Sequence, residues 1–231
     1  MMLFDVLEEA FSKERLSTFL RLSEGRRDEA ARLYTRNIRL STSLYPLLQT
    51  FELLLRNRMN VILTQKFGPD WFWSEAILAG LDDVVRSGIK ETPRQNYLNQ
   101  LKKTVDKHGR GDLLPNLTFG WWKQLFNRHH NELWDLTLHR ILPQETRRDS
   151  NRRAFLNILN EANDLRNRIA HHEPIVDQSL EMRYRKIRDV LTKMSEPVSI
   201  WLNEIDRFEA ELRRDNIISH KEVDKHFAST N

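Results

Sequence analysis

Apolar side chains recur every three or four residues along almost the whole chain, and this helical period constrains the fold more than any other feature of the sequence. One clear stripe begins at Leu44 and continues through Phe51 and Leu55 to Leu63. No strand pattern is convincing anywhere. Glycine and proline number only seven each in 231 residues, too few for the many turns of an all-β protein. The pattern predicts an all-α protein with no sheet.

Two prolines mark the ends of predicted helices. Pro46 is predicted in the first turn of the helix that begins at Leu44, where a missing N–H is tolerated. A second long helix is predicted over residues 151–172. Pro174 disfavours the α conformation of the residue before it, so this helix is predicted to fray near His172. A capping box, with a proline at the first helical position, is predicted where Thr92 precedes Gln95 by three residues.

The spacing of these helices and of the loops between them predicts one all-α domain over residues 1–214. Its core helices are expected at about 28–67 and 144–214, with a helical insertion at about 70–143. Residues 215–231 form a polar tail that is expected to be flexible.

Composition narrows the class of protein. An apolar share of 39% beside 30% charged residues is the balance of a globular protein with a sizeable core. The absence of cysteine excludes disulfides, thiolate metal ligands and cysteine nucleophiles, and it suits the cytoplasm. The longest uncharged run, residues 40–51, is too short to span a membrane, and no leader pattern opens the chain. A cytoplasmic protein without a membrane partner is expected.

Charge gives only a weak indication of a partner. The formal net charge is +4, and arginine outnumbers lysine among the 37 basic residues. Guanidinium groups match phosphate oxygens, which hints at a nucleic acid. A net charge this small is equally compatible with an ordinary solvated surface.

Two predicted helices carry polar residues where a core helix is usually apolar. The first carries Glu52, Arg56 and Asn57. The second carries a larger set near its end: Asp164, Arg166, Asn167, Arg168, His171 and His172. Arg166 and His171 are five positions apart, which is about 140° around an ideal helix. They converge only if the helix end unwinds, or if the arginine of one chain serves the histidine of another.

Other interpretations of these residues remain open. Asp164, Arg168, Glu173 and the two histidines fit a buried ion-pair network between crossing helices. A metal site is not expected, because the chain has no cysteine and no pair of histidines four apart. The six tryptophans are either base-stacking residues of a nucleic-acid binder or, as is more usual, core residues. They are Trp71, Trp73, Trp121, Trp122, Trp134 and Trp201.

The end of the second helix also resembles a known motif. The run Arg166-Asn167-Arg168-Ile169-Ala170-His171 fits the R-x(4–6)-H motif of the HEPN superfamily. The wider chain is similar to the Abi-like, or abortive-infection, bacterial branch of that superfamily, in segments that follow the family's order. These segments are residues 13–16, 31–34, 51–57, 67–71, 117–121 and 165–175.

This resemblance implies a HEPN-type helical bundle that is usually dimeric. Active members of the superfamily are metal-independent endoribonucleases, so a bacterial defence or toxin-type enzyme that needs no cofactor is expected. RNA would be cleaved by its own 2′-hydroxyl group in a site shared between two subunits. Cleavage without a metal requires a group that exchanges protons near neutral pH and a cation for the developing charge, which histidine and arginine supply.

The predicted catalytic residues are Arg166, which holds the scissile phosphate, Asn167, which orients it or the imidazole, and His171, the general acid or base. A helix C-terminus favours a protonated imidazole at that position. Supporting roles are predicted for Arg168, His172, Asp164, Glu52, Arg56 and Asn57. Contacts with the RNA backbone are predicted for Arg147, Arg148, Arg152 and Arg153.

Two alternatives of other classes stay open. The first is a non-catalytic RNA-binding or regulatory HEPN module that acts with, or is held in check by, a structured RNA or a protein antitoxin. The second is a helical interaction domain with no nucleic acid.

Overall fold

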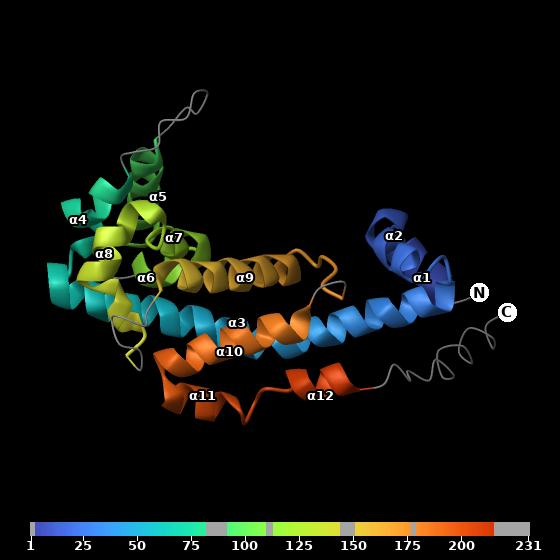
Figure 1. Ribbon diagram of the computed structural model, residues 1–231. Helices are drawn as coiled ribbons and strands as arrows, with labels where there is room; N and C mark the ends of the chain where they lie inside the picture. Colours follow the sequence, from blue (N-terminus) through green and yellow to red (C-terminus); the bar gives the residue numbers. More distant parts are fainter. Residues whose placement is uncertain (1–2, 82–91, 110–112, 144–150, 177–178, 215–231) are drawn as a thin grey trace. The chain divides into compact units, whose positions relative to one another are not determined.

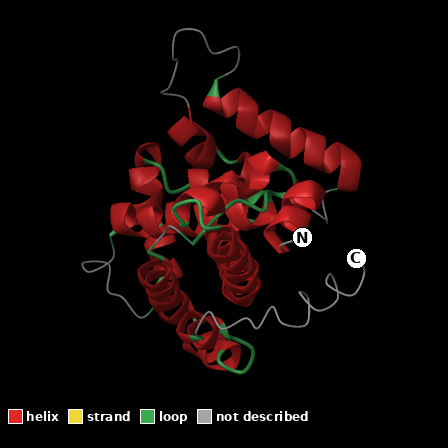
Figure 2. Cartoon of the chain, turned by 90° about the vertical axis from the view of Figure 1, so that its right-hand side faces the viewer, coloured by secondary structure: helices red, strands yellow, loops and turns green. Residues whose placement is uncertain are grey.

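The protein is helical throughout the part that the structure describes (Figure 2). The computed structural model describes residues 3–81, 92–109, 113–143, 151–176 and 179–214. These residues form twelve α-helices and four short 3₁₀-helices, and no strand occurs among them. The prediction of an all-α protein is confirmed for these ranges. The finer expectation of a HEPN-type bundle stays a prediction.

The chain divides into two compact units. The first unit comprises Met1–Leu47, Asp164–Arg185 and Asn203–Asn231, and the second comprises Leu48–Asn163 and Lys186–Leu202. Three helices contribute residues to both units: α3 (Arg27–Phe67), α9 (Arg152–Ala170) and α10 (Leu180–Met194). The expected arrangement of one domain with a helical insertion stays a prediction.

Three helices belong wholly to the first unit: α1 (Leu3–Phe11), α2 (Lys13–Leu22) and α12 (Phe208–Arg213). Ser12 caps α2 by accepting a hydrogen bond from the backbone N–H of Arg15. The apolar faces of α1, α2 and the start of α3 meet in one buried cluster. It consists of Phe4, Leu16, Phe19, Ala30 and Ala31.

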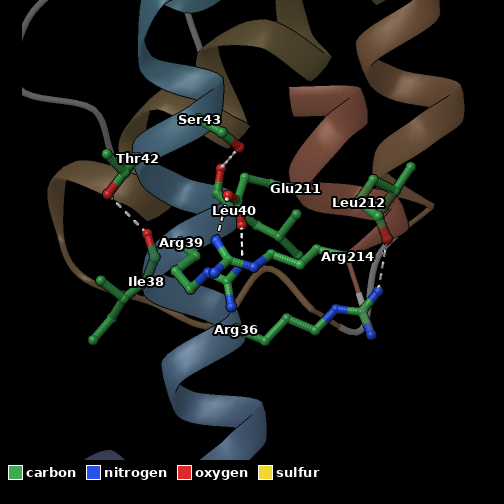
Figure 3. Close-up of polar contacts among 9 residues, drawn as sticks. All are labelled: Arg36, Ile38, Arg39, Leu40, Thr42, Ser43, Glu211, Leu212 and Arg214. Atoms are coloured by element: carbon green, nitrogen blue, oxygen red, sulfur yellow. Dashed lines mark hydrogen bonds and ion pairs between the residues drawn. The ribbon is translucent and has the colours of Figure 1, made fainter. Parts of the chain in front are cut away.

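Charged side chains connect α12 to α3 within the first unit (Figure 3). Arg39 forms an ion pair with Glu211, and Arg36 donates to the carbonyl oxygen of Leu212 at 3.4 Å. Arg214 pairs with the other carboxylate oxygen of Glu211 at 3.2 Å. Although burial acts to raise it, the pKa of Glu211 lies below its ordinary value because Arg39 and Arg214 stabilise the carboxylate.

Six helices belong wholly to the second unit. They are α4 (Glu75–Leu78), α5 (Pro93–His108), α6 (Leu113–Asn116), α7 (Phe119–Gln124), α8 (Asn131–Leu136) and α11 (Glu196–Leu202). The predicted capping box of α5 is present: the Thr92 hydroxyl accepts from the N–H of Gln95, whose side chain accepts from the N–H of Thr92.

An aromatic cluster fills the second unit. Trp71 stacks on Phe72 with ring centres 3.7 Å apart, and Tyr97 stacks on Trp121 at 4.8 Å. Trp122 lies against Trp121 edge to face and is fully buried. The core interpretation is confirmed for these tryptophans and for the buried Trp134. Trp73 is half-buried and Trp201 is half exposed.

Helix α3 continues through Pro46 without interruption (Figure 1). The prediction that Pro46 lies in the first turn of a helix is therefore wrong. Tertiary packing explains why the helix continues through the proline. Leu40 and Leu44 before the proline and Leu47 after it are all nearly inaccessible to solvent. Proline has no N–H, so the carbonyl oxygen of Thr42 lacks its usual helical donor.

Candidate RNA-cleavage site

The last turns of α9 present the motif residues at the surface of the first unit. The side chains of Arg166, His171 and His172 are exposed, while Asn167 and Arg168 are half-buried. Arg166 donates a hydrogen bond to the side-chain oxygen of Asn167 at 3.4 Å. A solvent-borne ligand can therefore reach the guanidinium and imidazole groups of this segment.

The helix ends in a closed turn rather than by fraying. The N–H of His172 donates to the carbonyl of Ile169 at 3.1 Å, and the N–H of Glu173 donates to that of Arg168 at 2.7 Å. This pair of bonds is the Schellman arrangement, which requires a left-handed residue at the turn. His172 takes that conformation, with φ of 57°. The predicted fraying before Pro174 is wrong, because backbone hydrogen bonds satisfy the terminal carbonyls.

This closed turn keeps the side chains of Arg166 and His171 pointing in different directions. The N–H of His171 still donates to the carbonyl of Asn167 at 2.9 Å, so the backbone stays helical from Arg166 to His171. The two residues consequently lie about 140° apart around the axis. The helix end is therefore not unwound in the structure, so Arg166 and His171 of one chain are not brought together in that way.

Arginine and aspartate side chains brace the end of α9. Arg168 donates to the carbonyl oxygen of Pro174 at 2.6 Å and lies 3.8 Å from the carboxylate of Asp164. Asp164 pairs more closely with Arg183 of α10, at 2.8 Å. Asp164 and Arg168 of the anticipated network thus lie close together, but the Asp164 side chain is 53% exposed, so these pairs are not the buried network that was expected. Within the described residues, the imidazoles of His171 and His172 take no part in it.

Two residues near this site were missed by the sequence reasoning. The guanidinium of Arg15 donates to the carbonyl oxygens of His171 at 3.3 Å and of His172 at 2.7 Å. The side-chain oxygen of the buried Asn37 accepts from the N–H of Ile175 at 2.7 Å. The only signal in the sequence was that Arg15 belongs to residues 13–16, one of the segments that resemble the Abi-like family.

The remaining predicted residues lie in the second unit or outside the described residues. Glu52 and Arg56 are half-buried on α3 and Asn57 is exposed, and their place in the site stays a prediction. Arg152 donates to the side-chain oxygen of Asn131 at 2.5 Å and to the carbonyl oxygen of Phe126, and burial lowers its pKa. Arg153 is exposed. Arg147 and Arg148 lie outside the described residues.

The geometry of the described residues adds two negative findings. None of their helices is long and apolar enough to cross a bilayer. Nor do they bring three histidine or carboxylate side chains together as a metal site would need.

Comparison with known proteins adds no assignment. No family model, curated protein or solved structure matches the chain.

Proposed function

We propose that this chain is a metal-independent endoribonuclease of the Abi-like HEPN type, acting as a homodimer in a bacterial abortive-infection or toxin-type defence system. The observation that carries the proposal is the exposed set of guanidinium and imidazole groups on the last turns of α9. An imidazole exchanges protons near neutral pH, and a guanidinium binds phosphate oxygens through a fork of N–H groups.

In the proposed reaction, the 2′-hydroxyl of RNA attacks the adjacent phosphorus and loses its proton to a base. The bond from phosphorus to the 5′ oxygen breaks, and an acid protonates that oxygen. The products are a 2′,3′-cyclic phosphate and a free 5′-hydroxyl. His171 acts as the acid or the base, Arg166 stabilises the charge on the phosphate, and Asn167 orients the phosphate or the imidazole.

The divergence of Arg166 and His171 within one helix supports a site that is completed by a second subunit. In a two-fold symmetric dimer, each site takes Arg166 from one copy and His171 from the other. Two equivalent sites result.

Incubation of purified protein with mixed RNA in EDTA tests the activity. We expect cleavage that leaves cyclic-phosphate and 5′-hydroxyl ends, and a loss of roughly 10²–10⁴-fold in His171→Ala. Arg166→Ala should lose a comparable factor. His129→Ala, a half-buried histidine of the second unit, is the matched control and should cut normally. Cleavage that survives both motif substitutions removes the assignment.

Mixing the two inactive variants tests the shared site. A dimer of one Arg166→Ala chain and one His171→Ala chain retains one intact composite site of two. Random exchange of subunits should therefore restore about a quarter of the wild-type activity. No recovery, with subunit exchange verified by mass, would mean that each chain supplies its own cation.

The same divergence also favours a second candidate, a HEPN module that binds RNA without cutting it. A helix that points its arginine and histidine apart still offers both to a phosphate backbone. Tight RNA binding by the unaltered chain, with intact product ends, would select this function.

A further inference from the structure

A cavity of about 530 Å³ lies beside the end of α9, wholly within the first unit. Its walls come from α3, including Tyr34, Thr42, Tyr45 and Pro46, and from the left-handed residue His172. Its size is within the range of sites that hold small organic ligands. The residue that closes α9 therefore also forms part of a cavity.

The α3 wall presents an exposed aromatic ring. Tyr45 is 59% exposed and Ile38, two turns earlier on the same face, is 49% exposed. Tyr34 is already packed against Phe19, with ring centres 5.2 Å apart, whereas within the described residues Tyr45 has no ring contact. This wall thus offers an exposed stacking surface.

Arg15 brings a cation to this helix end, which also carries the exposed carboxylate of Glu173. Arg15 places one guanidinium nitrogen on the carbonyl of His172, which lines the cavity, and on that of His171. A guanidinium has five donors, so nitrogens remain for an anion after these bonds. A phosphate that binds these nitrogens would lie at the turn formed by His171 and His172, and His172 lines the same cavity as Tyr45.

We propose that this cavity, bounded by Tyr45, Pro46 and His172, is a nucleotide subsite for single-stranded RNA. An unstacked base lies on the ring of Tyr45, and its phosphate lies between Arg15 and His171. Single-stranded RNA is recognised by stacking splayed bases on aromatic side chains, which suits an exposed tyrosine in a cavity of this size. This inference rests on the proposed function, because it names how the substrate is seated at the same helix end.

The test uses the unaltered full chain and, as the probe, a fluorescent ten-nucleotide single-stranded RNA whose 2′-hydroxyls are methylated, so that it cannot be cut. Tyr45→Leu should weaken binding roughly tenfold, because leucine fills space but does not stack on a base. Trp201→Leu is the matched control, since it removes an aromatic residue that is 50% exposed in the second unit, and it should bind like the parent. Sedimentation of each variant should give the same mass.

Other outcomes separate this inference from the nuclease. Equal RNA affinity of the parent and Tyr45→Leu overturns the subsite and leaves the nuclease proposal intact. A change of mass in Tyr45→Leu with unchanged affinity overturns it too, because the patch is then a contact between subunits. Weaker binding in Tyr45→Leu, together with a wild-type chain that never cuts, supports the subsite and rejects the nuclease. No binding by any protein rejects the subsite, while the cleavage assay with mixed RNA decides the nuclease.

Discussion

The core of the second unit and the segment after α9 in the first unit are stabilised by different kinds of interaction. The second unit is built around stacked, tilted and edge-to-face aromatic rings, among them Trp71, Trp121 and Trp122. In the first unit, the segment that follows α9 is held by single polar side chains on backbone groups, as Arg15 and Asn37 show. Burial of aromatic rings removes a large apolar area from water, and this stabilisation is non-directional. Each polar bond, in contrast, fixes the position of one peptide group.

This difference predicts that the aromatic core determines the stability of the protein, whereas the polar bonds determine the position of the motif segment. Removal of a ring from the second unit should lower the free energy of unfolding and leave the motif segment of the folded protein in place. Removal of one polar anchor from the first unit should cost less stability and displace the segment that carries His171 and His172. Each substitution below tests one side of this contrast.

The largest effect is expected for Trp122→Ala. Trp122 is fully buried, and truncation of a buried tryptophan to alanine destabilises a protein by about 3–5 kcal/mol. Urea denaturation followed by circular dichroism measures the loss. Trp201→Ala, at a half-exposed position in the same unit, should change stability by no more than about 0.5 kcal/mol. Equal losses in the two variants would show that the aromatic cluster is not the stabilising core.

A smaller effect is expected for Asn37→Leu. Leucine has a similar volume but no acceptor, so the N–H of Ile175 is left buried without a partner, which costs about 1–3 kcal/mol. Asn57→Leu, at an exposed asparagine of the same helix, is the control and should be nearly neutral. RNA affinity should fall for Asn37→Leu in the folded protein. A stability loss without any change in RNA affinity would mean that Asn37 does not position the motif segment.

His130 is expected to make the stability of the protein depend on pH. It is 1% exposed, its Nε2 donates to the carbonyl of Ile77 at 3.0 Å, and burial lowers its pKa. Below about pH 6.5 the unfolded chain takes up a proton at this residue that the folded chain does not, so stability falls as pH falls.

This slope is at most about 1.4 kcal/mol per pH unit, since one proton is involved. Denaturation midpoints between pH 7.5 and 5 measure it. His130→Gln should flatten this part of the profile. A wild-type profile that stays level over this range would contradict the buried, neutral state of His130.

Local features of the fold could be predicted from the sequence, whereas the anchors of the site could not. The capping box at Thr92 and Gln95 depends on residues three apart, and the buried tryptophans follow from their size and hydrophobicity. The bond from Arg15 to the carbonyl of His171 joins residues 156 positions apart, and that from Ile175 to Asn37 joins residues 138 apart. No periodicity encodes such pairs, because they arise only when the helices pack.

The helix end was mispredicted for a related reason. A Schellman turn is usually signalled by glycine, and the chain has no glycine after Gly120. His172 takes the left-handed conformation without that signal. Pro174 correctly predicted that the helix ends near His172, but the end is a closed Schellman turn and not a frayed one.

The smallest effect, and the one that bears most directly on the positioning role, is expected for His172→Gly. A left-handed non-glycine residue carries a strain of about 1–2 kcal/mol. Glycine removes this strain but loses about 0.5–1 kcal/mol through its greater freedom in the unfolded chain. The net gain in stability should be about 0.5–1 kcal/mol by thermal denaturation. His171→Gly is the matched control, because that position has no positive φ and should gain nothing.

The affinity of His172→Gly for single-stranded RNA should fall although its stability rises. His172→Gly leaves the Schellman turn intact but removes a wall of the cavity beside Tyr45. A more stable protein that binds single-stranded RNA less tightly would mean that the strained backbone is retained because the imidazole is needed there. A less stable protein would mean instead that the His172 side chain contributes contacts worth more than the strain, and the contrast between a stabilising second unit and a positioning first unit would weaken at this residue.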